Sequence, residues 1–234
     1  MKWNKKYNYP TSSRSVINGS RHYTLNNQIL VSVSSVLKMT KSESEKASLK
    51  AWQDRIGFKE SLRIKNEAAQ RGTEMHSLIE NFLLGRSNLN LFEQEKEKSH
   101  PQKMADLIIS EGLKNKLSEI NGVECVLHYP RPKGFAGTSD LIGIWDNIPS
   151  VIDYKNKNSI MKESYDSLQT YFIQLGAYSL AHNTVYGSSI TQGVILLATT
   201  DLVFQVFRIN NEKLIEYQNK FLDKVEQYYS IINK

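Results

Sequence analysis

The sequence predicts an α/β fold in which a central mixed β-sheet is flanked by helices. Segments with the alternating, β-branched character of strands occur near residue 30 and repeatedly after residue 122, and segments rich in helix formers lie between and after them. The 234 residues are 40% hydrophobic, which is enough to bury one sizeable core. We therefore expect a single domain over residues 1–234, with an N-terminal strand and helical region over about 1–120 and a core over about 121–234.

The N-terminal region is expected to contain a strand followed by helices. Residues 28–36 (QILVSVSSV) alternate apolar and polar side chains, which predicts a strand that ends in a serine-rich turn. Residues 44–84 are rich in helix formers and predict two or three helices, with breaks at Gly57 and Gly72. We expect Gly85 to end the last of these helices.

The remainder of the chain is expected to alternate helices and strands. The polar residues 86–100 predict an exposed loop that leads into a helix over about 101–120. Apolar segments separated by turns then predict an antiparallel meander of strands at 123–129, 135–145 and 150–156. Beyond them we expect a helix over about 162–182, strands at 192–199 and 202–209, and a helix over 211–232.

Net charge and cysteine content limit the classes of function. The formal net charge of +6 favours a polyanionic partner, although many basic proteins bind no nucleic acid. The single cysteine, Cys125, excludes an internal disulfide and a cysteine-rich zinc site. No apolar run is long enough for a membrane span, and the start MKWNKKYNYP lacks the hydrophobic segment of a signal peptide. We expect a protein without membrane contact, in the cytoplasm of a bacterial or phage-infected cell.

Two carboxylates and a lysine are predicted to converge within residues 137–157 (GTSDLIGIWDNIPSVIDYKNK). Side chains alternate faces along a strand, so Asp153 and Lys155 share one face and Tyr154 points to the other. Asp140 lies on the preceding strand, and a hairpin can bring it beside Asp153. Carboxylate oxygens suit Mg²⁺ shared with a substrate phosphate, so the arrangement indicates phosphodiester hydrolysis.

An acid and a lysine on a strand can also form a solvated edge, which is the more common arrangement for charged residues. Two features favour a site instead. The strand is apolar up to Asp153, so its charges emerge at the end of a buried element, where sites are commonly placed. Asp140 follows the small residues GFAGTS, which would allow a backbone or a phosphate to approach closely.

These residues resemble motifs II and III of the PD-(D/E)XK nucleases: GTSD ending at Asp140, and VIDYK ending at Lys155. The RecB-type branch adds an upstream GxxxH, matched by Gly72 to His76, and a downstream QxxxY, matched by Gln174 to Tyr178. The resemblance covers about residues 20–230 and is closest to the mitochondrial genome maintenance exonucleases and their phage and bacterial relatives.

The resemblance implies the roles of the central residues. Asp140, Asp153 and the backbone carbonyl of Tyr154 would bind Mg²⁺ or Mn²⁺, and Lys155 would be the catalytic lysine. His76 would lie near the metal as a ligand or a phosphate contact. Without the resemblance, a histidine on an apolar helix face would more often be a satisfied core residue.

Further residues receive supporting roles, each with an alternative. Glu80, one helical turn after the histidine, would hold the imidazole or bind metal through water, or it is a surface polar residue. Glu124 aligns with the first acidic motif as a metal ligand, yet an exposed carboxylate fits equally well. Gln174 and Tyr178 would steady the lysine or the DNA. Tyr171 is either a DNA contact or ordinary core packing.

In the mitochondrial genome maintenance exonucleases that the chain resembles, helices form an arch that admits single strands. The helical segment 46–71 contains Trp52 and Phe58 and could bind DNA through phosphate contacts and base stacking. A solvated helix face is the alternative. The cations of this segment include Lys50, Arg55, Lys59, Arg63, Lys65 and Arg71.

The sequence therefore predicts a single nuclease domain: a Mg²⁺- or Mn²⁺-dependent DNA exonuclease that acts on single-stranded or flapped DNA with a free end. Replication, repair or recombination is the expected setting, with replication or recombination proteins as further partners. The alternatives are a non-catalytic DNA-binding or assembly module with the same fold, an endonuclease, or an RNA nuclease, because these motifs define chemistry and not substrate.

Overall fold

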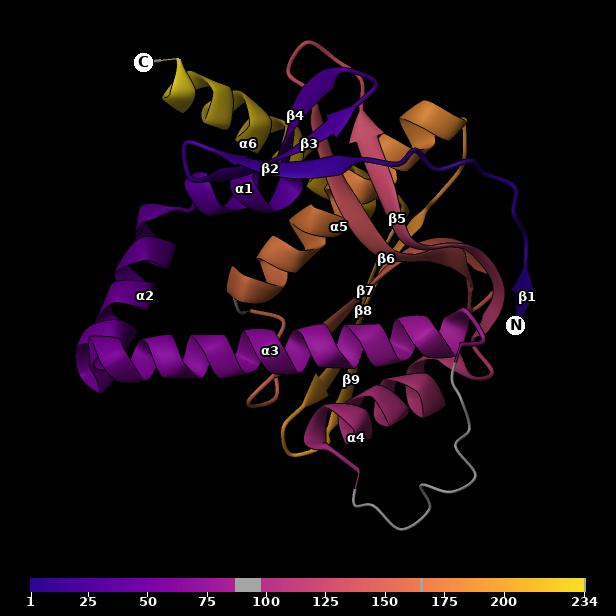
Figure 1. The fold of residues 1–234 in the computed structure, drawn as a ribbon, viewed down its shortest axis with the longest axis horizontal. Helices are drawn as coiled ribbons and strands as arrows, with labels where there is room; N and C mark the ends of the chain where they lie inside the picture. The colour runs from indigo at the N-terminus through magenta and orange to yellow at the C-terminus, as the bar shows by residue number, and fades with distance from the viewer. Residues whose placement is uncertain (87–97, 165, 234) are drawn as a thin grey trace.

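The computed structural model describes residues 1–86, 98–164 and 166–233, and its centre is one mixed sheet (Figure 1). In this described part, nine strands pair in the order β2-β3-β4-β6-β7-β8-β9, with β5 beside β6 and β1 beside β5. The expected α/β fold is confirmed. The strands are β1 (Lys2–Trp3), β2 (Ser13–Ile17), β3 (Ser20–Leu25), β4 (Gln28–Ser32), β5 (Leu117–Tyr129), β6 (Phe135–Trp145), β7 (Ile148–Lys157), β8 (Gln192–Thr199) and β9 (Phe204–Asn210).

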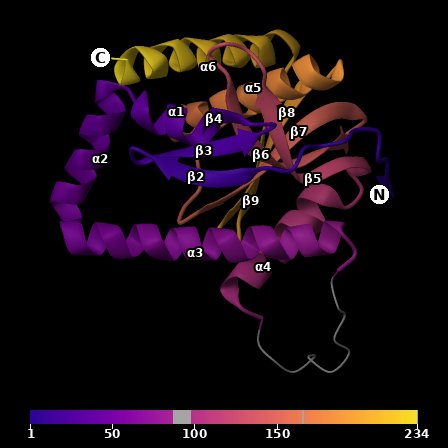
Figure 2. The same cartoon turned by 45° about the horizontal axis from the view of Figure 1, so that its top comes forward.

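Helices cover both faces of the sheet (Figures 1 and 2). The α5 and α6 helices pack on one face, and α3, α4 and a short π-helix pack on the other. The helices are α1 (Val33–Met39), α2 (Glu43–Ile56), α3 (Phe58–Leu83), α4 (His100–Leu107), the π-helix (Ile108–Leu113), α5 (Asp166–Tyr186) and α6 (Asn211–Ile232). None of the helices in the described ranges combines the length and the apolar character that crossing a membrane requires.

The meander β5-β6-β7 is antiparallel, as predicted, and carries the motif residues. Along β7 the side chains alternate between two cores: Val151 packs with α5 and α6, whereas Ile152 and Tyr154 pack with α3 and α4. The crossover through α5 then makes β8 parallel to β7. The predicted bounds are confirmed for β6, β8 and α6.

A β-hairpin before residue 28 was not predicted. It consists of β2 and β3, joined at Asn18 and Gly19, whose φ angles are +49° and +74°. An Asn-Gly pair favours such a tight turn because both residues tolerate the left-handed region. This dipeptide is the signal in the sequence that predicts the hairpin.

The strand predicted over residues 28–36 is shorter than expected and does not end in a turn. It ends at Ser32, whose hydroxyl accepts a hydrogen bond from the backbone N–H of Ser35 (3.0 Å). Ser32 therefore caps α1, and the following serines begin a helix.

The predicted helix break at Gly72 is wrong, whereas the break at Gly57 is confirmed. The α3 helix runs through Gly72 because this buried glycine faces Asn156 of β7, and an added Cβ would lie 2.6 Å from its Nδ2 atom. Gly72 thus allows α3 to approach the sheet. Gly57 has a φ of +86°, and Gly85, at +65°, follows the end of α3 as expected.

Three other predicted boundaries are wrong. The helix expected over 101–120 gives way to strand at Leu117, because Leu117 and Ile120 pair with β6 and enter the core beneath α3. The helix expected at 162 begins at Asp166, and the strand expected at 202 begins at Phe204 because Leu202 lies in a turn with a φ of +58°. Most of the loop predicted over 86–100 lies outside the described residues.

Candidate functional site

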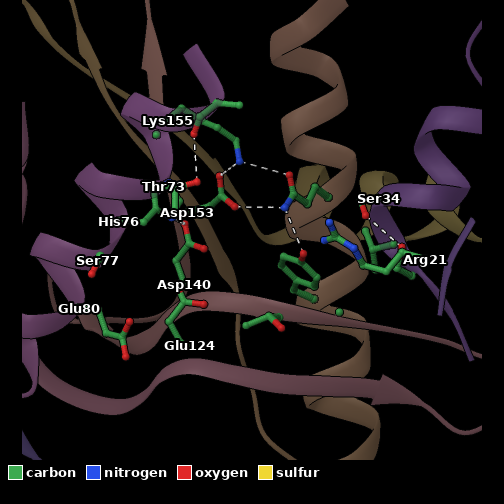
Figure 3. A pocket seen from close by; sticks show the side chains of 18 of the residues that line it. Arg21, Ser34, Thr73, His76, Ser77, Glu80, Glu124, Asp140, Asp153 and Lys155 are labelled. Carbon is green, nitrogen blue, oxygen red and sulfur yellow. Dashed lines mark hydrogen bonds and ion pairs between the residues drawn. The ribbon is translucent and has the colours of Figure 1, made fainter. Parts of the chain in front are cut away.

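A cavity of about 550 Å³ lies between α3, α5, the middle of the sheet and the β2-β3 hairpin (Figure 3). Eight side chains from the sequence prediction line it. They come from α3, β5, β6, β7 and α5, so segments distant in sequence meet here. The eight are His76, Glu80, Glu124, Asp140, Asp153, Lys155, Gln174 and Tyr178.

One end of this cavity is acidic. His76, Glu124 and Asp140 each offer a ligand atom, and these atoms lie within 4.8 Å of one another. Glu80, one turn beyond His76 on α3, lines the same end (Figure 3). Burial and the charge of Asp140 raise the pKa of Glu124 to about 7. Glu124 therefore binds a proton more readily than a carboxyl group in water.

Glu124 reaches this position through an unusual backbone conformation. Its φ is +47°, and its neighbours Val123 and Cys125 pair with Leu141 and Ser139, so it lies across from Asp140. A residue other than glycine in this region costs about 1–3 kcal/mol, and such strain is concentrated at functional sites. The structure thus places Glu124 half-buried against Asp140 and not as an exposed carboxylate.

Tyr154 is fixed by its backbone between two of these residues. Its N–H donates to Oδ2 of Asp140 (2.8 Å), and its carbonyl accepts from Nε2 of His76 (3.0 Å). The other imidazole nitrogen, Nδ1, lies 3.5 Å from Oδ2 of Asp140. Burial alone would lower the pKa of His76, but the charge and hydrogen bond of Asp140, with the charge of Asp153, together outweigh burial and raise this pKa to about 9.

The remaining motif residues lie around the ammonium group of Lys155. It forms an ion pair with Asp153 and lies 3.4 Å from Oε1 of Gln174. Nε2 of Gln174 in turn lies 3.2 Å from Oδ1 of Asp153 and 3.1 Å from the hydroxyl of Tyr178. Burial would lower the pKa of Lys155, yet the charges of Asp153 and Asp140 raise it. Lys155 is therefore held as a cation.

Tyr171 completes the surroundings of this lysine. Nζ of Lys155 lies 4.8 Å from the centroid of its ring, and Nζ of Lys157 lies 5.3 Å from it. Both distances are within the range of a cation–π contact. The partly buried ring also packs against the core below α5, so it combines core packing with a contact to the site.

Arg71 and Trp52, like Tyr154 and Tyr171, lie outside the cavity lining. Arg71 donates from Nε to Asn156 (3.0 Å) and from Nη2 to Asn158 (2.6 Å), which ties α3 to the end of β7. Trp52 is half-buried on α2. Several lining residues were not predicted. Three of them, Arg14, Arg21 and Tyr23, lie on the unpredicted β2-β3 hairpin, and the others include Ser34 of α1, Thr73 of α3 and Thr138 of β6.

The basic helical segment 46–71 is part of a frame of three helices beside the sheet. Figure 2 shows α1, α2 and α3 as three sides of this frame. The α2 helix has no buried residue within its described length, and the first half of α3 is mostly exposed. One of the predicted cations, Arg63, pairs with Glu60 and Glu67 of its own helix.

Comparisons with known proteins find similar chains among solved structures. No protein-family model and no curated protein matches the chain. Among solved structures, the chain is similar to a "Putative exonuclease" from Eubacterium rectale, with 17% sequence identity and a TM-score of 0.48. The match covers 70% of this chain and 65% of that chain, so it spans less than two thirds of the neighbour's length.

Proposed function

We propose that the chain is a divalent-metal-dependent nuclease of the PD-(D/E)XK class that hydrolyses phosphodiester bonds in DNA. The observation that carries the proposal is the convergence in one cavity of Asp140, Glu124 and His76 with the Asp153–Lys155 pair. A buried set of carboxylates beside a fixed cation is suited to phosphoryl chemistry, because metal and lysine can act on one phosphate.

The residues present fit a divalent cation. Because Nε2 of His76 donates to the carbonyl of Tyr154, a neutral imidazole would turn the lone pair of Nδ1 toward Oδ2 of Asp140, 3.5 Å away. A proton or a cation must then lie between these two acceptors. Carboxylate oxygens with one imidazole are ligands that Mg²⁺ and Mn²⁺ accept. Asp140, Glu124 and His76 would hold the ion, with Asp153 and the carbonyl of Tyr154 beside it.

When bound, the cation would neutralise charge on the phosphate and lower the pKa of a water molecule. The chain supplies the rest of the chemistry. Since Lys155 is held as a cation, it would stabilise negative charge on the phosphate and orient the attacking water, and it is poorly suited to remove a proton. Gln174 and Tyr171 would keep its ammonium group in place.

The proposed substrate is single-stranded or flapped DNA with a free end, and the proposed activity is exonucleolytic. The frame of α1, α2 and α3 carries exposed lysines, including Lys50, Lys59 and Lys65, which suit phosphate contacts. Phe58 is 75% exposed and could stack on a base. A flexible strand can enter such a frame more easily than a rigid duplex. Roles in replication, repair or recombination, and protein partners from these processes, belong to this proposal.

Initial cleavage rates on matched DNA forms test this function. Purified protein with Mg²⁺, Mn²⁺ or EDTA is incubated with linear single strands, linear duplex and circular single strands of one sequence. We expect metal-dependent cleavage, fastest on the linear single strand and slowest on the circle. Comparable rates on the circle would indicate an endonuclease. Binding without cleavage under all metal conditions would indicate a non-catalytic DNA-binding module.

A further inference from the structure

The cavity has a basic end on the side of the β2-β3 hairpin, where Arg14 also lies beside Glu124. Arg14 and Arg21 line it from the β2-β3 hairpin, together with Ser34 at the start of α1. Figure 3 shows Arg21 and Ser34 on the side of the cavity away from Glu80 and Glu124. Neither arginine has a role in the chemistry described above.

The hairpin places both arginines on one face. Arg14 of β2 is the cross-strand partner of Tyr23 on β3, and Arg21 lies two residues before Tyr23. Cross-strand partners and residues two apart share a face of a sheet. The backbone of Arg21 is anchored by Ser35, whose hydroxyl accepts from its N–H (2.7 Å).

The guanidinium group of Arg14 is held in place before any ligand binds. Its Nη2 donates to the hydroxyl of Thr138 on β6 (2.8 Å), and its central carbon lies 5.3 Å from the ring centroid of Tyr23. The hydroxyl of Tyr23 lies 3.2 Å from the same Thr138 oxygen. A guanidinium group has five N–H donors, and the hydrogen bond to Thr138 uses one of them.

The position of Thr138 fixes the distance of this group from the proposed metal ligand. Thr138 and Asp140 are two residues apart on β6, so their side chains share a face and lie about 6.6 Å apart along the strand. This separation is similar to that of neighbouring phosphates along a nucleic-acid strand. A strand with one phosphate at Asp140 would present its next phosphate near Arg14.

Across residues 1–86, 98–164 and 166–233, neither Arg14 nor Arg21 takes part in an ion pair. Arg14 nevertheless lies close enough to Glu124 for its charge to act on the pKa of that carboxyl. Arginine matches the geometry of phosphate oxygens with paired N–H donors, and a partly enclosed cavity strengthens that attraction.

Resting on the proposed nuclease function, we propose that Arg14 and Arg21 bind the phosphate that neighbours the scissile phosphate on the same strand. This contact would set the register of the strand, so that one particular phosphodiester bond lies at Asp140 and Lys155. The class of ligand is a nucleic-acid phosphate diester.

A double-mutant cycle, with one change in the protein and one in the substrate, tests the contact. The substrates are an unmodified oligonucleotide and two versions with one uncharged methylphosphonate, placed one nucleotide to either side of the cleaved bond. We expect the wild type to lose about 10- to 100-fold in kcat/KM on one of the two, as for a lost charged hydrogen bond. Arg14→Gln should lose a similar factor on the unmodified strand and little more on that modified strand, because the two changes remove the same contact.

Arg21→Gln should behave in the same way, and Arg131→Gln is the matched control. Arg131 also lies over a tyrosine, 6.0 Å from the ring centroid of Tyr129, but in the turn between β5 and β6 and outside the cavity lining. This variant should retain wild-type kcat/KM on every substrate. The proposal is overturned if, for both methylphosphonate positions, the loss in kcat/KM of Arg14→Gln on the modified strand equals the product of the two separate losses.

Binding without divalent metal separates this inference from the proposed function. Fluorescence anisotropy with the same oligonucleotides, at several salt concentrations, needs no cleavage. Arg14→Gln should reduce the slope of log Kd against log salt by about 1, as expected for one lost phosphate contact. An unchanged slope would overturn the phosphate contact even if the wild type cleaves DNA. If the wild type cleaves no DNA but Arg14→Gln still reduces the salt slope, the phosphate contact is supported and the nuclease proposal is refuted.

Discussion

The carboxylate of Asp140 on β6 accepts a hydrogen bond from the backbone N–H of Tyr154 on β7, at 2.8 Å. Tyr154 lies between Asp153 and Lys155 in the sequence, so this bond fixes the first acid relative to the strand that carries the second acid and the lysine. The carbonyl of Tyr154 is bonded to His76 on α3. One residue therefore links three elements through its backbone, while its side chain is buried in the core below.

Removal of the Tyr154 hydroxyl should leave the site intact. The side chain is 2% exposed, and its hydroxyl has no hydrogen-bond partner among the described residues. A buried hydroxyl without a partner is unfavourable, so Tyr154→Phe should leave the free energy of unfolding unchanged or raise it by about 1 kcal/mol. Cleavage should persist, because only backbone groups of this residue face the site.

Tyr178→Phe is the matched control for that variant. It removes the same atom, but here the hydroxyl is bonded to Gln174, which lies beside Asp153 and Lys155. Denaturant unfolding and kcat are measured for both variants. A Tyr154→Phe protein that is less stable than the Tyr178→Phe protein would contradict the assignment of an unsatisfied hydroxyl at Tyr154.

Loss of the lysine should affect turnover more than binding. Lys155→Ala removes a cation that would stabilise charge developing on the phosphate, and losses of about 10²- to 10³-fold in kcat are typical for one such group. DNA affinity should change only modestly, because the interaction strengthens in the transition state. Single-turnover cleavage and anisotropy give the two values. An equal loss in both would make Lys155 a phosphate anchor.

The ring of Tyr171 should support that lysine. Tyr171→Phe keeps the aromatic face under Lys155 and Lys157, whereas Tyr171→Leu keeps apolar volume and removes the face. A cation–π contact of about 1 kcal/mol predicts a loss of roughly fivefold in kcat for the leucine variant and wild-type turnover for the phenylalanine variant. Equal turnover in the two variants, measured in parallel at saturating DNA, would exclude this role.

The stability of the metal-free protein should depend on pH through Glu124. Its pKa is raised from 4.5 to about 7, chiefly by burial and then by Asp140, so the folded protein binds this proton more tightly than the unfolded chain. The resulting stabilisation is fully present below pH 4.5 and is lost as pH rises through about 7. His76, with its pKa raised to about 9, contributes a loss in the same direction at higher pH.

Glu124→Gln removes the titrating carboxyl group and keeps a side chain of similar size. In EDTA, the melting temperature of this variant relative to the wild type should therefore increase between pH 5 and pH 8. Addition of Mg²⁺ should raise the wild-type melting temperature at pH 8 more than that of the variant, since Glu124 would be a ligand. If the two proteins share one pH profile in EDTA, Glu124 is not a charged neighbour of Asp140.

The part of the site that depends on local periodicity was predictable. Asp153 and Lys155 share a face because strand side chains alternate, and Asp140 lies beside them because β6 and β7 form a hairpin. His76 and Glu80 share the cavity because they are one helical turn apart. These relationships need only short-range geometry.

The basic end of the cavity was not predictable in the same way. Arg14 reaches Thr138 because β4 pairs with β6, where Val31 faces Phe135 across more than a hundred residues of sequence. No short-range pattern indicates that pairing. The same limit applies to Gly72, which was predicted to break a helix and instead allows α3 to approach Asn156.

The most direct test of the proposed site is Mg²⁺-dependent cleavage of a linear single strand by Asp140→Asn and Asp153→Asn. Each change removes a carboxylate charge at nearly constant volume. Thermal unfolding checks that both variants fold, and Arg131→Gln is the activity control. We expect at least a 100-fold loss of initial rate, of the order expected for a group acting directly on the reaction, in folded protein with either substitution. Near-wild-type rates in both variants would contradict it.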